Sequence, residues 1–97
     1  MPTYITLWNY TQHGIENIDD SPNRADQAAE LAESMGGELK EIYLTMGQYD
    51  LVTVAEFPDD DAAAKVLLRV GQSGAVSGET MKAWPEDDYR ELIANLP

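Results

Sequence analysis

A short polar turn between two apolar runs limits the folds open to this chain. Residues 39–44 and 51–57 are rich in apolar side chains, and the six residues TMGQYD at positions 45–50 separate them. Gly47 in this turn can adopt a positive φ without the steric cost of a Cβ. A short loop that contains Gly, between two strand-like runs, is typical of a β-hairpin. The turn therefore predicts that both runs are strands and that they pair antiparallel.

The residues before the hairpin begin with a strand pattern. In residues 3–10, Ile5 and Leu7 alternate with the set Tyr4, Thr6 and Trp8, which is the period of two that places neighbours on opposite faces of a sheet. One face of this strand is aliphatic and the other is aromatic with hydroxyl groups. Both faces therefore have apolar surface to bury.

Two helices and a fourth strand complete the pattern. Residues 21–35 and 59–70 carry apolar side chains at helical spacing. The Ser-Pro pair at positions 21 and 22 suits a helix start, with Ser21 as the capping residue. Residues 75–84 read as a strand, in which Gly78 indicates a bulge or a close approach of another segment. A last short helix follows Pro85.

The element order β-α-β-β-α-β, followed by a C-terminal helix, predicts an α+β fold of the ferredoxin-like type. We expect one domain over residues 1–97, with an antiparallel four-stranded sheet and two helices on one face. The other face is predicted to carry Tyr4, Thr6, Trp8 and Tyr43, an aromatic patch larger than monomers usually expose. We therefore expect a homodimer, or a higher homo-oligomer, that packs these faces together into a dimeric α/β barrel. The C-terminal helix would lie across the partner or the barrel end.

Composition narrows the class of partner. The chain has 18 acidic and 6 basic residues, and its formal net charge is −12. Such a field repels phosphate backbones and anionic lipids, so neither nucleic acid nor a membrane is an expected partner. The acidity fits a well-solvated domain, or adaptation to high salt, where ions screen the repulsion. The absence of Cys and of a long apolar stretch leads us to expect a cytoplasmic protein.

Four segments resemble the GYD domain family. They are GIENI at residues 14–18, SPNRA at 21–25, MGQYD at 46–50 and GETMKA at 78–83. The family is named for a Gly, a Tyr and an Asp, which are Gly47, Tyr49 and Asp50 here. The resemblance runs over nearly the whole chain, and it implies a ferredoxin-like fold of the dimeric α/β-barrel type. It assigns no biochemical function.

Two polar residues are candidates for catalysis. Asp50 follows the hairpin tip, where its carboxylate is either a general base or an acceptor for backbone N–H groups of the turn. His13 is the only His, and it is either an acid/base group near the sheet or a surface residue. Because no second His and no Cys is present, we expect no transition-metal site. The Asp-rich runs lack the spacing of a calcium loop, and we expect no metal or cofactor.

Five aromatic residues are the predicted ligand-binding set: Tyr4, Trp8, Tyr43, Tyr49 and Trp84. They either line a pocket within the barrel or pack at the interface between subunits, because aromatic side chains suit both environments.

Three functions are consistent with these patterns. The first is an oligomeric domain that binds a small ligand, with no catalysis evident. The second is a small cofactor-independent enzyme, such as an oxygenase or isomerase, by analogy of fold only. The third is a structural or interaction module whose interface contains no cavity. A cavity with His13 or a buried carboxylate in it would favour the enzyme.

Overall fold

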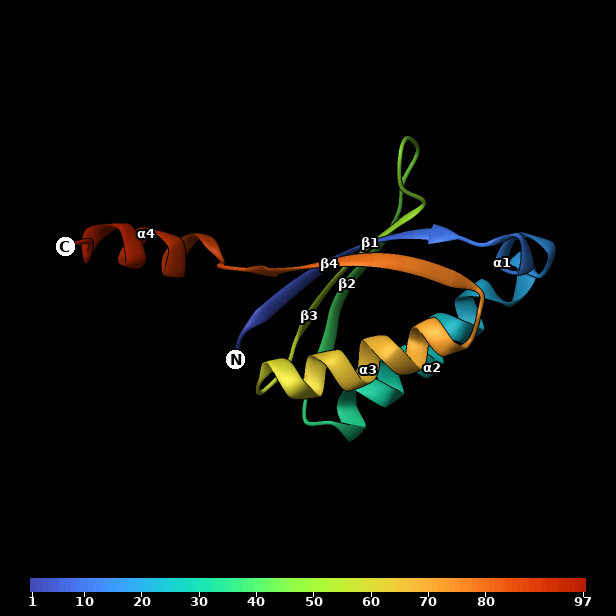
Figure 1. The fold of residues 1–97 in the computed structure, drawn as a ribbon, viewed down its shortest axis with the longest axis horizontal. Helices are drawn as coiled ribbons and strands as arrows, with labels where there is room; N and C mark the ends of the chain where they lie inside the picture. Colours follow the sequence, from blue (N-terminus) through green and yellow to red (C-terminus); the bar gives the residue numbers. More distant parts are fainter.

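A computed structural model describes all of residues 1–97 (Figure 1). Its elements, in chain order, are β1 (Thr3–Tyr10), α1 (Gln12–Glu16), a 3-10 turn η1 (Ile18–Asp20), α2 (Ser21–Ser34), β2 (Glu38–Leu44), β3 (Leu51–Glu56), α3 (Asp60–Gln72), β4 (Val76–Ala83) and α4 (Glu86–Ala94). The strands form one antiparallel sheet in the order β2-β3-β1-β4. The α+β, ferredoxin-like prediction is confirmed.

The hairpin turn joins β2 to β3 as its sequence predicts. Thr45 N donates to Asp50 O at 2.8 Å, which closes the loop, and Gly47 has a φ of 138°. A side chain at that φ is strained, so glycine is the residue that this turn accepts most readily.

Helices α2 and α3 lie side by side on one face of the sheet (Figure 1). Tyr4, Thr6 and Trp8 are buried on this same face, where they line a cavity together with residues of both helices. The prediction that they lie on the uncovered face was therefore wrong. Period-two alternation separates the two sets of side chains, but it does not say which set faces the helices.

The inner surfaces of the helices explain why the aromatic face of β1 packs against them. Ala32 in α2 and Ala62 and Ala63 in α3 are buried, and they pack in one cluster with Tyr4 and Phe57. Small residues on the helices leave room for large rings on the sheet. The Tyr4 and Phe57 rings meet edge to face, with 5.8 Å between centroids.

Gly78 marks a close approach and not a bulge. Strand β4 pairs with β1 in a continuous register, in which Gly78 lies opposite Trp8. A Cβ at Gly78 would lie 2.6 Å from Trp8 Cε3, so the missing side chain makes room for the indole. The irregularity in the sheet is in β2, between Leu39 and Glu41.

The other face of the sheet has no helix over it. The register places Ile5 and Leu7 of β1 beside Val54 and Val52 of β3, and Met81 of β4 lies opposite Ile5. The first four are half-buried and Met81 is exposed. We call these five residues the open face. These five side chains are apolar and four of them are aliphatic. The register also places Tyr43 opposite Val52 and Glu79 opposite Leu7 on the uncovered side of the sheet, so of the predicted aromatic residues only Tyr43 lies there.

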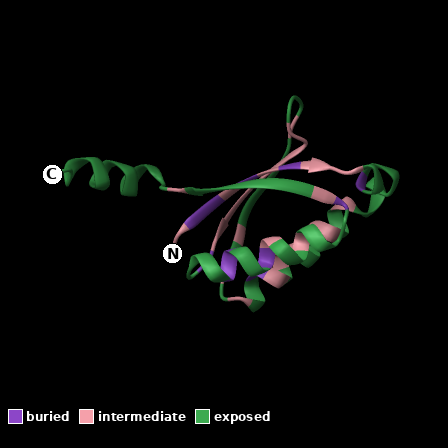
Figure 2. Ribbon diagram, viewed as in Figure 1, coloured by how far each residue is buried: buried purple, intermediate pink, exposed green.

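Helix α4 extends away from the rest of the chain. Figure 1 shows it beyond the end of β4, and Figure 2 shows it exposed along its whole length. Its apolar side chains are uncovered, with exposed fractions of 49% to 61% for Tyr89, Leu92, Ile93 and, just beyond the helix, Leu96. We call these four residues the stripe of α4. No helix in the structure has the length and apolar character that a membrane span requires.

The predicted capping role of Ser21 was wrong. Ser21 is the first residue of α2, and Asp20 precedes it in the capping position. The reason is that η1 runs directly into α2, so the chain is already turning when it reaches Ser21. The Ser21 hydroxyl instead lies 2.8 Å from the hydroxyl of Tyr10, with which it shares a hydrogen bond.

Candidate functional site

A cavity of about 270 Å³ lies between the helices and the sheet. Strands β1, β2 and β3 form its floor, and α2 and α3 form its roof. Residues that line it from the strands include Tyr4, Thr6, Trp8, Leu39, Ile42, Leu51, Thr53 and Ala55. Residues that line it from the helices include Ser21, Arg24, Ala25, Ala28, Leu31, Ala32, Val66, Leu67, Arg69 and Val70.

The cavity exists because small side chains stand where the two layers meet. Its walls include Ala25, Ala28, Ala32, Ala55 and Ala75, and no large side chain of the protein is fully buried. An engineered cavity of about 150 Å³ lined by apolar residues holds benzene. The space here is larger than that, and it approaches the lower limit of typical ligand pockets, about 300 Å³.

The polar groups on the floor are already paired with one another. Trp8 Nε1 donates to Thr53 Oγ1 at 2.9 Å, and the hydroxyls of Thr6 and Thr80 share a hydrogen bond at 2.9 Å. These groups therefore fix the shape of the floor.

Arg24 is the exception among the polar groups of the wall. Its Nη1 donates to the backbone oxygen of Asn17 at 3.1 Å, whereas its Nη2 is buried without any hydrogen-bond partner. Arg69 also lines the cavity, and its Nη1 donates to Gln72 Oε1 at 2.7 Å. Two of the three Arg residues of the chain thus lie at this cavity, while none of its 18 acidic residues does.

The structure separates the five predicted aromatic residues. Tyr4 and Trp8 line the cavity, but Tyr43, Tyr49 and Trp84 do not. Tyr43 is exposed on β2 and donates to Glu41 Oε2, while Tyr49 donates to Glu79 Oε2 at 3.1 Å. Each of these hydrogen bonds to a carboxylate raises the pKa of its tyrosine. Trp84 follows β4 and is 55% exposed, so the five residues do not form one site.

The two candidate catalytic residues also lie outside the cavity. Asp50 Oδ2 accepts from the backbone N–H of Tyr10 at 2.9 Å, and Asp50 N donates to Trp8 O at 2.8 Å. The carboxylate thus extends the contact between β1 and β3 and does not cap its own turn. His13 is exposed in α1, where its ring faces the side chain of Asn17.

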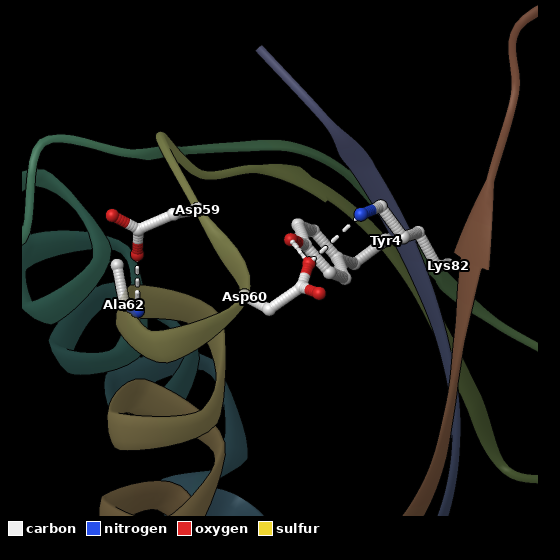
Figure 3. Close-up of polar contacts among 5 residues, drawn as sticks. All are labelled: Tyr4, Asp59, Asp60, Ala62 and Lys82. Carbon is white, nitrogen blue, oxygen red and sulfur yellow. Dashed lines mark hydrogen bonds and ion pairs between the residues drawn. The ribbon is translucent and has the colours of Figure 1, made fainter.

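A polar cluster that sequence reasoning missed lies at the start of α3 (Figure 3), and it includes Tyr4 of the cavity lining. Tyr4 donates its hydroxyl to Asp60 Oδ1, and Lys82 Nζ lies 3.0 Å from the same oxygen. Asp59 Oδ1 accepts from Ala62 N at 2.8 Å and caps α3. Tyr4, Asp60 and Lys82 come from β1, α3 and β4, which are far apart in the sequence. No local sequence pattern therefore predicts the cluster.

This cluster shifts two pKa values in opposite directions. Burial, together with the bond to Asp60, raises the pKa of Tyr4 to about 12. The bonds from Tyr4 and Lys82 lower the pKa of the Asp60 carboxyl. Both groups therefore keep their ordinary charge states near neutral pH, and the cluster holds β1, β4 and α3 together.

No group of three or more His, Asp and Glu side chains is arranged to hold a metal ion. A second, more open hollow lies between α2 and α3, and it includes Leu31, Met35, Lys65 and Leu68. The cavity under the helices is thus the better enclosed of the two.

Two solved structures have the same fold. A feast or famine regulatory protein from M. tuberculosis, complexed with L-methionine, aligns with a TM-score of 0.67 at 14% identity over 88% of this chain. The chain spans about half, 51%, of that regulator. TTHA0845 from Thermus thermophilus aligns with a TM-score of 0.55 at 23% identity, over 88% of this chain and 95% of the other.

The sequence comparisons give the family. A relative from Thermus thermophilus, the glutamine synthetase and cystathionine beta-lyase binding protein, is 34% identical over 97 residues, which cover 99% of each chain. The sequence model of the GYD domain matches residues 4–93. The protein therefore belongs to the GYD domain family.

Proposed function

We propose that the protein is a homo-oligomeric binding protein whose target is another protein, a metabolic enzyme of the glutamine synthetase or cystathionine beta-lyase kind. The observation that carries this proposal is the relative named for binding those two enzymes, because its similarity extends over 99% of both chains. The geometry supports the proposal through two unpartnered apolar surfaces, the open face and the stripe of α4.

A second copy of the chain is the proposed cover for the open face. The face combines aliphatic side chains from β1, β3 and β4, and burial of apolar surface is favourable by about 25 cal/mol per Å². Two copies that pair these faces form the dimeric α/β barrel. Helix α4 reaches beyond its own sheet (Figure 1), so its stripe can pack on the partner.

Pairing of the sheets leaves the helix layer as the outer surface of the dimer. Helix α2 carries three acidic residues outside the cavity lining: Asp26, Glu30 and Glu33. Acidic surfaces select basic patches on a partner and increase association rates at low salt. We assign the enzyme contact to this acidic surface of α2.

The binding test uses the purified chain and the glutamine synthetase and cystathionine beta-lyase of the same organism, by isothermal titration calorimetry at low and high salt. Saturable binding that weakens with salt is expected for at least one enzyme. The variant Glu30→Gln with Glu33→Gln should weaken it. The matched control, Asp87→Asn with Asp88→Asn on α4, should leave it unchanged. Absence of binding to both enzymes at every salt concentration would refute the proposed function.

The cavity supports a second function, the binding of a small molecule. Tyr4 and Trp8 of the predicted ligand-binding set line it, whereas Tyr43, Tyr49 and Trp84 have no place in it. We propose the first two as ligand contacts. This function needs the cavity alone and is compatible with protein binding.

A further inference from the structure

We propose that the cavity between the helices and the sheet binds a small amphipathic monocarboxylate, with the carboxylate at Arg24 and the apolar body against Trp8 and Ala28. This inference rests on the second function proposed above and names the chemical class of its ligand. It is carried by three observations: a partly open apolar cavity, an Arg residue of its lining with an unpaired guanidinium nitrogen, and a charge in the lining opposite to that of the chain as a whole.

Arg24 has a guanidinium nitrogen without a hydrogen-bond partner. A buried donor without a partner is costly, and natural structures leave few of them. Arg24 Nη2 is such a donor, while Nη1 of the same group is held by Asn17 O. Nη2 is closed off from the cavity as well as from solvent, so a ligand meets it once the guanidinium turns toward the cavity. A carboxylate is the anion whose planar geometry suits a guanidinium, and it would satisfy the free N–H groups.

The charge of the cavity lining differs in sign from that of the chain as a whole. The chain as a whole has a net charge of −12, but the residues that line the cavity include Arg24 and the exposed Arg69 and no Asp or Glu. The cavity thus favours an anion within a protein that otherwise repels anions. That surrounding field disfavours multiply charged anions most, which selects a single carboxylate over a phosphate ester.

The cationic and the apolar residues of the lining lie at different ends of the cavity. Arg24 is near the start of α2 and Arg69 near the end of α3, and these two ends lie together in Figure 1. The cationic residues therefore gather at one end of the cavity. Toward the other end the walls are Ala32, Phe57 and Tyr4, whose hydroxyl is already bonded to Asp60. A ligand with an anionic head and an apolar tail matches this polarity.

The sequence contained a signal for Arg24. It precedes Ala28 by four positions and Leu31 by seven, so it lies on the same helical stripe as the core residues of α2. A cation on the inner stripe of a helix has to find an anion, a polar acceptor or water.

The test compares octanoate with octanol, its neutral counterpart, as probes of the full-length protein. The background is Trp84→Phe, so that Trp8 in the cavity gives the fluorescence signal. Octanoate should bind saturably and more tightly than octanol. Arg24→Met, which keeps an apolar stem but removes the guanidinium, should weaken octanoate by about ten-fold or more. It should leave octanol unchanged. Arg24→Lys should fall between wild type and Arg24→Met.

Two further variants keep the test decisive. Arg90→Met removes an exposed Arg of α4 that pairs with Glu86, and it should change neither affinity. Ala28→Phe fills the cavity and should abolish binding of both probes, which also serves if Arg24→Met fails to fold. Equal affinity for the two probes, or equal loss of both in Arg24→Met, would overturn the carboxylate assignment while small-molecule binding stands. If neither probe binds, or if octanoate still binds to Ala28→Phe, both the carboxylate assignment and small-molecule binding in the cavity are refuted.

Discussion

At the scale of single residues, the pair Trp8 and Gly78 shows how the floor of the cavity depends on one missing side chain. The indole occupies the space above Gly78, and its Nε1 is held by Thr53. This arrangement fixes Trp8 in the wall and determines the width of the cavity at that point. Loss of the space at position 78 displaces the ring.

We predict that Gly78→Ala destabilises the protein by about 1–3 kcal/mol, because the new Cβ would lie 2.6 Å from the indole and 2.9 Å from Thr6 Cγ2. Urea denaturation followed by circular dichroism measures the change. Gly71→Ala in α3 is the control, since no atom lies within 4 Å of its Cβ. It should stabilise the helix by up to about 1 kcal/mol. Equal effects of the two substitutions would contradict this account.

A second prediction at this scale concerns pH. The pKa of Asp60 is lowered in the folded state, so its charged form stabilises folding above the unfolded pKa of about 3.9. That contribution is lost as the pH falls through the lower, folded pKa. The difference in unfolding free energy between wild type and Asp60→Asn should thus be full at pH 6 and should shrink below about pH 4.

The control for this pH prediction is Asp61→Asn, in the same first turn of α3 but outside the contacts of Asp60 with Tyr4 and Lys82. Its difference from wild type should vary less with pH. A constant difference for Asp60→Asn across this range would show that the charge of Asp60 contributes no stability.

At the scale of elements, the sequence was sufficient for the order and type of the strands and the main helices. The hairpin at residues 45–50 and the periodicities around it identify them, because these signals are local. The side of the sheet that the helices cover was not predictable from alternation, which is symmetric between faces. The alanines on the inner helical stripes were the usable signal, because small roof residues require large floor residues such as Tyr4 and Trp8.

The candidate site was predictable only in part for the same reason. Residue type alone selects Tyr4 and Trp8, which line the cavity, but it also groups Tyr43 with them as if all three shared a face. The register across β2 places Tyr43 opposite Val52, and so on the side of the sheet that no helix covers. The contacts of Asp60 depend on the docking of α3 against two strands, which no local pattern encodes.

Helix α4 gives the prediction at this scale. Because it extends away from the other elements of the chain (Figure 1), deletion of residues 86–97 should leave the unfolding midpoint of the remaining domain nearly unchanged. If the stripe packs on a second copy, the deletion should weaken dimerisation by about ten-fold or more, given about 1.5–3 kcal/mol for one buried Leu. Leu92→Asp should reproduce the loss, and Glu91→Ala should not. If the truncated chain unfolds, α4 instead packs on the sheet and helices of its own chain and stabilises them.

At the scale of the whole molecule, the charge and the apolar open face act against each other. Each copy has a formal net charge of −12, so two copies repel, whereas the aliphatic side chains of the open face favour contact. Salt at 1 M shortens the range of the repulsion to about 3 Å and leaves the apolar contribution in place. Association between copies should therefore increase with salt.

Sedimentation equilibrium in dilute and in molar KCl tests the pairing of open faces most directly. The wild-type chain of 10.7 kDa should sediment at about twice that mass or more, most completely at high salt. Val54→Asp, in the centre of the open face, should sediment as a folded monomer, while Ala64→Asp on the exposed side of α3 should remain associated. A wild-type monomer in molar KCl, or a Val54→Asp variant that associates as well as wild type, would contradict the account.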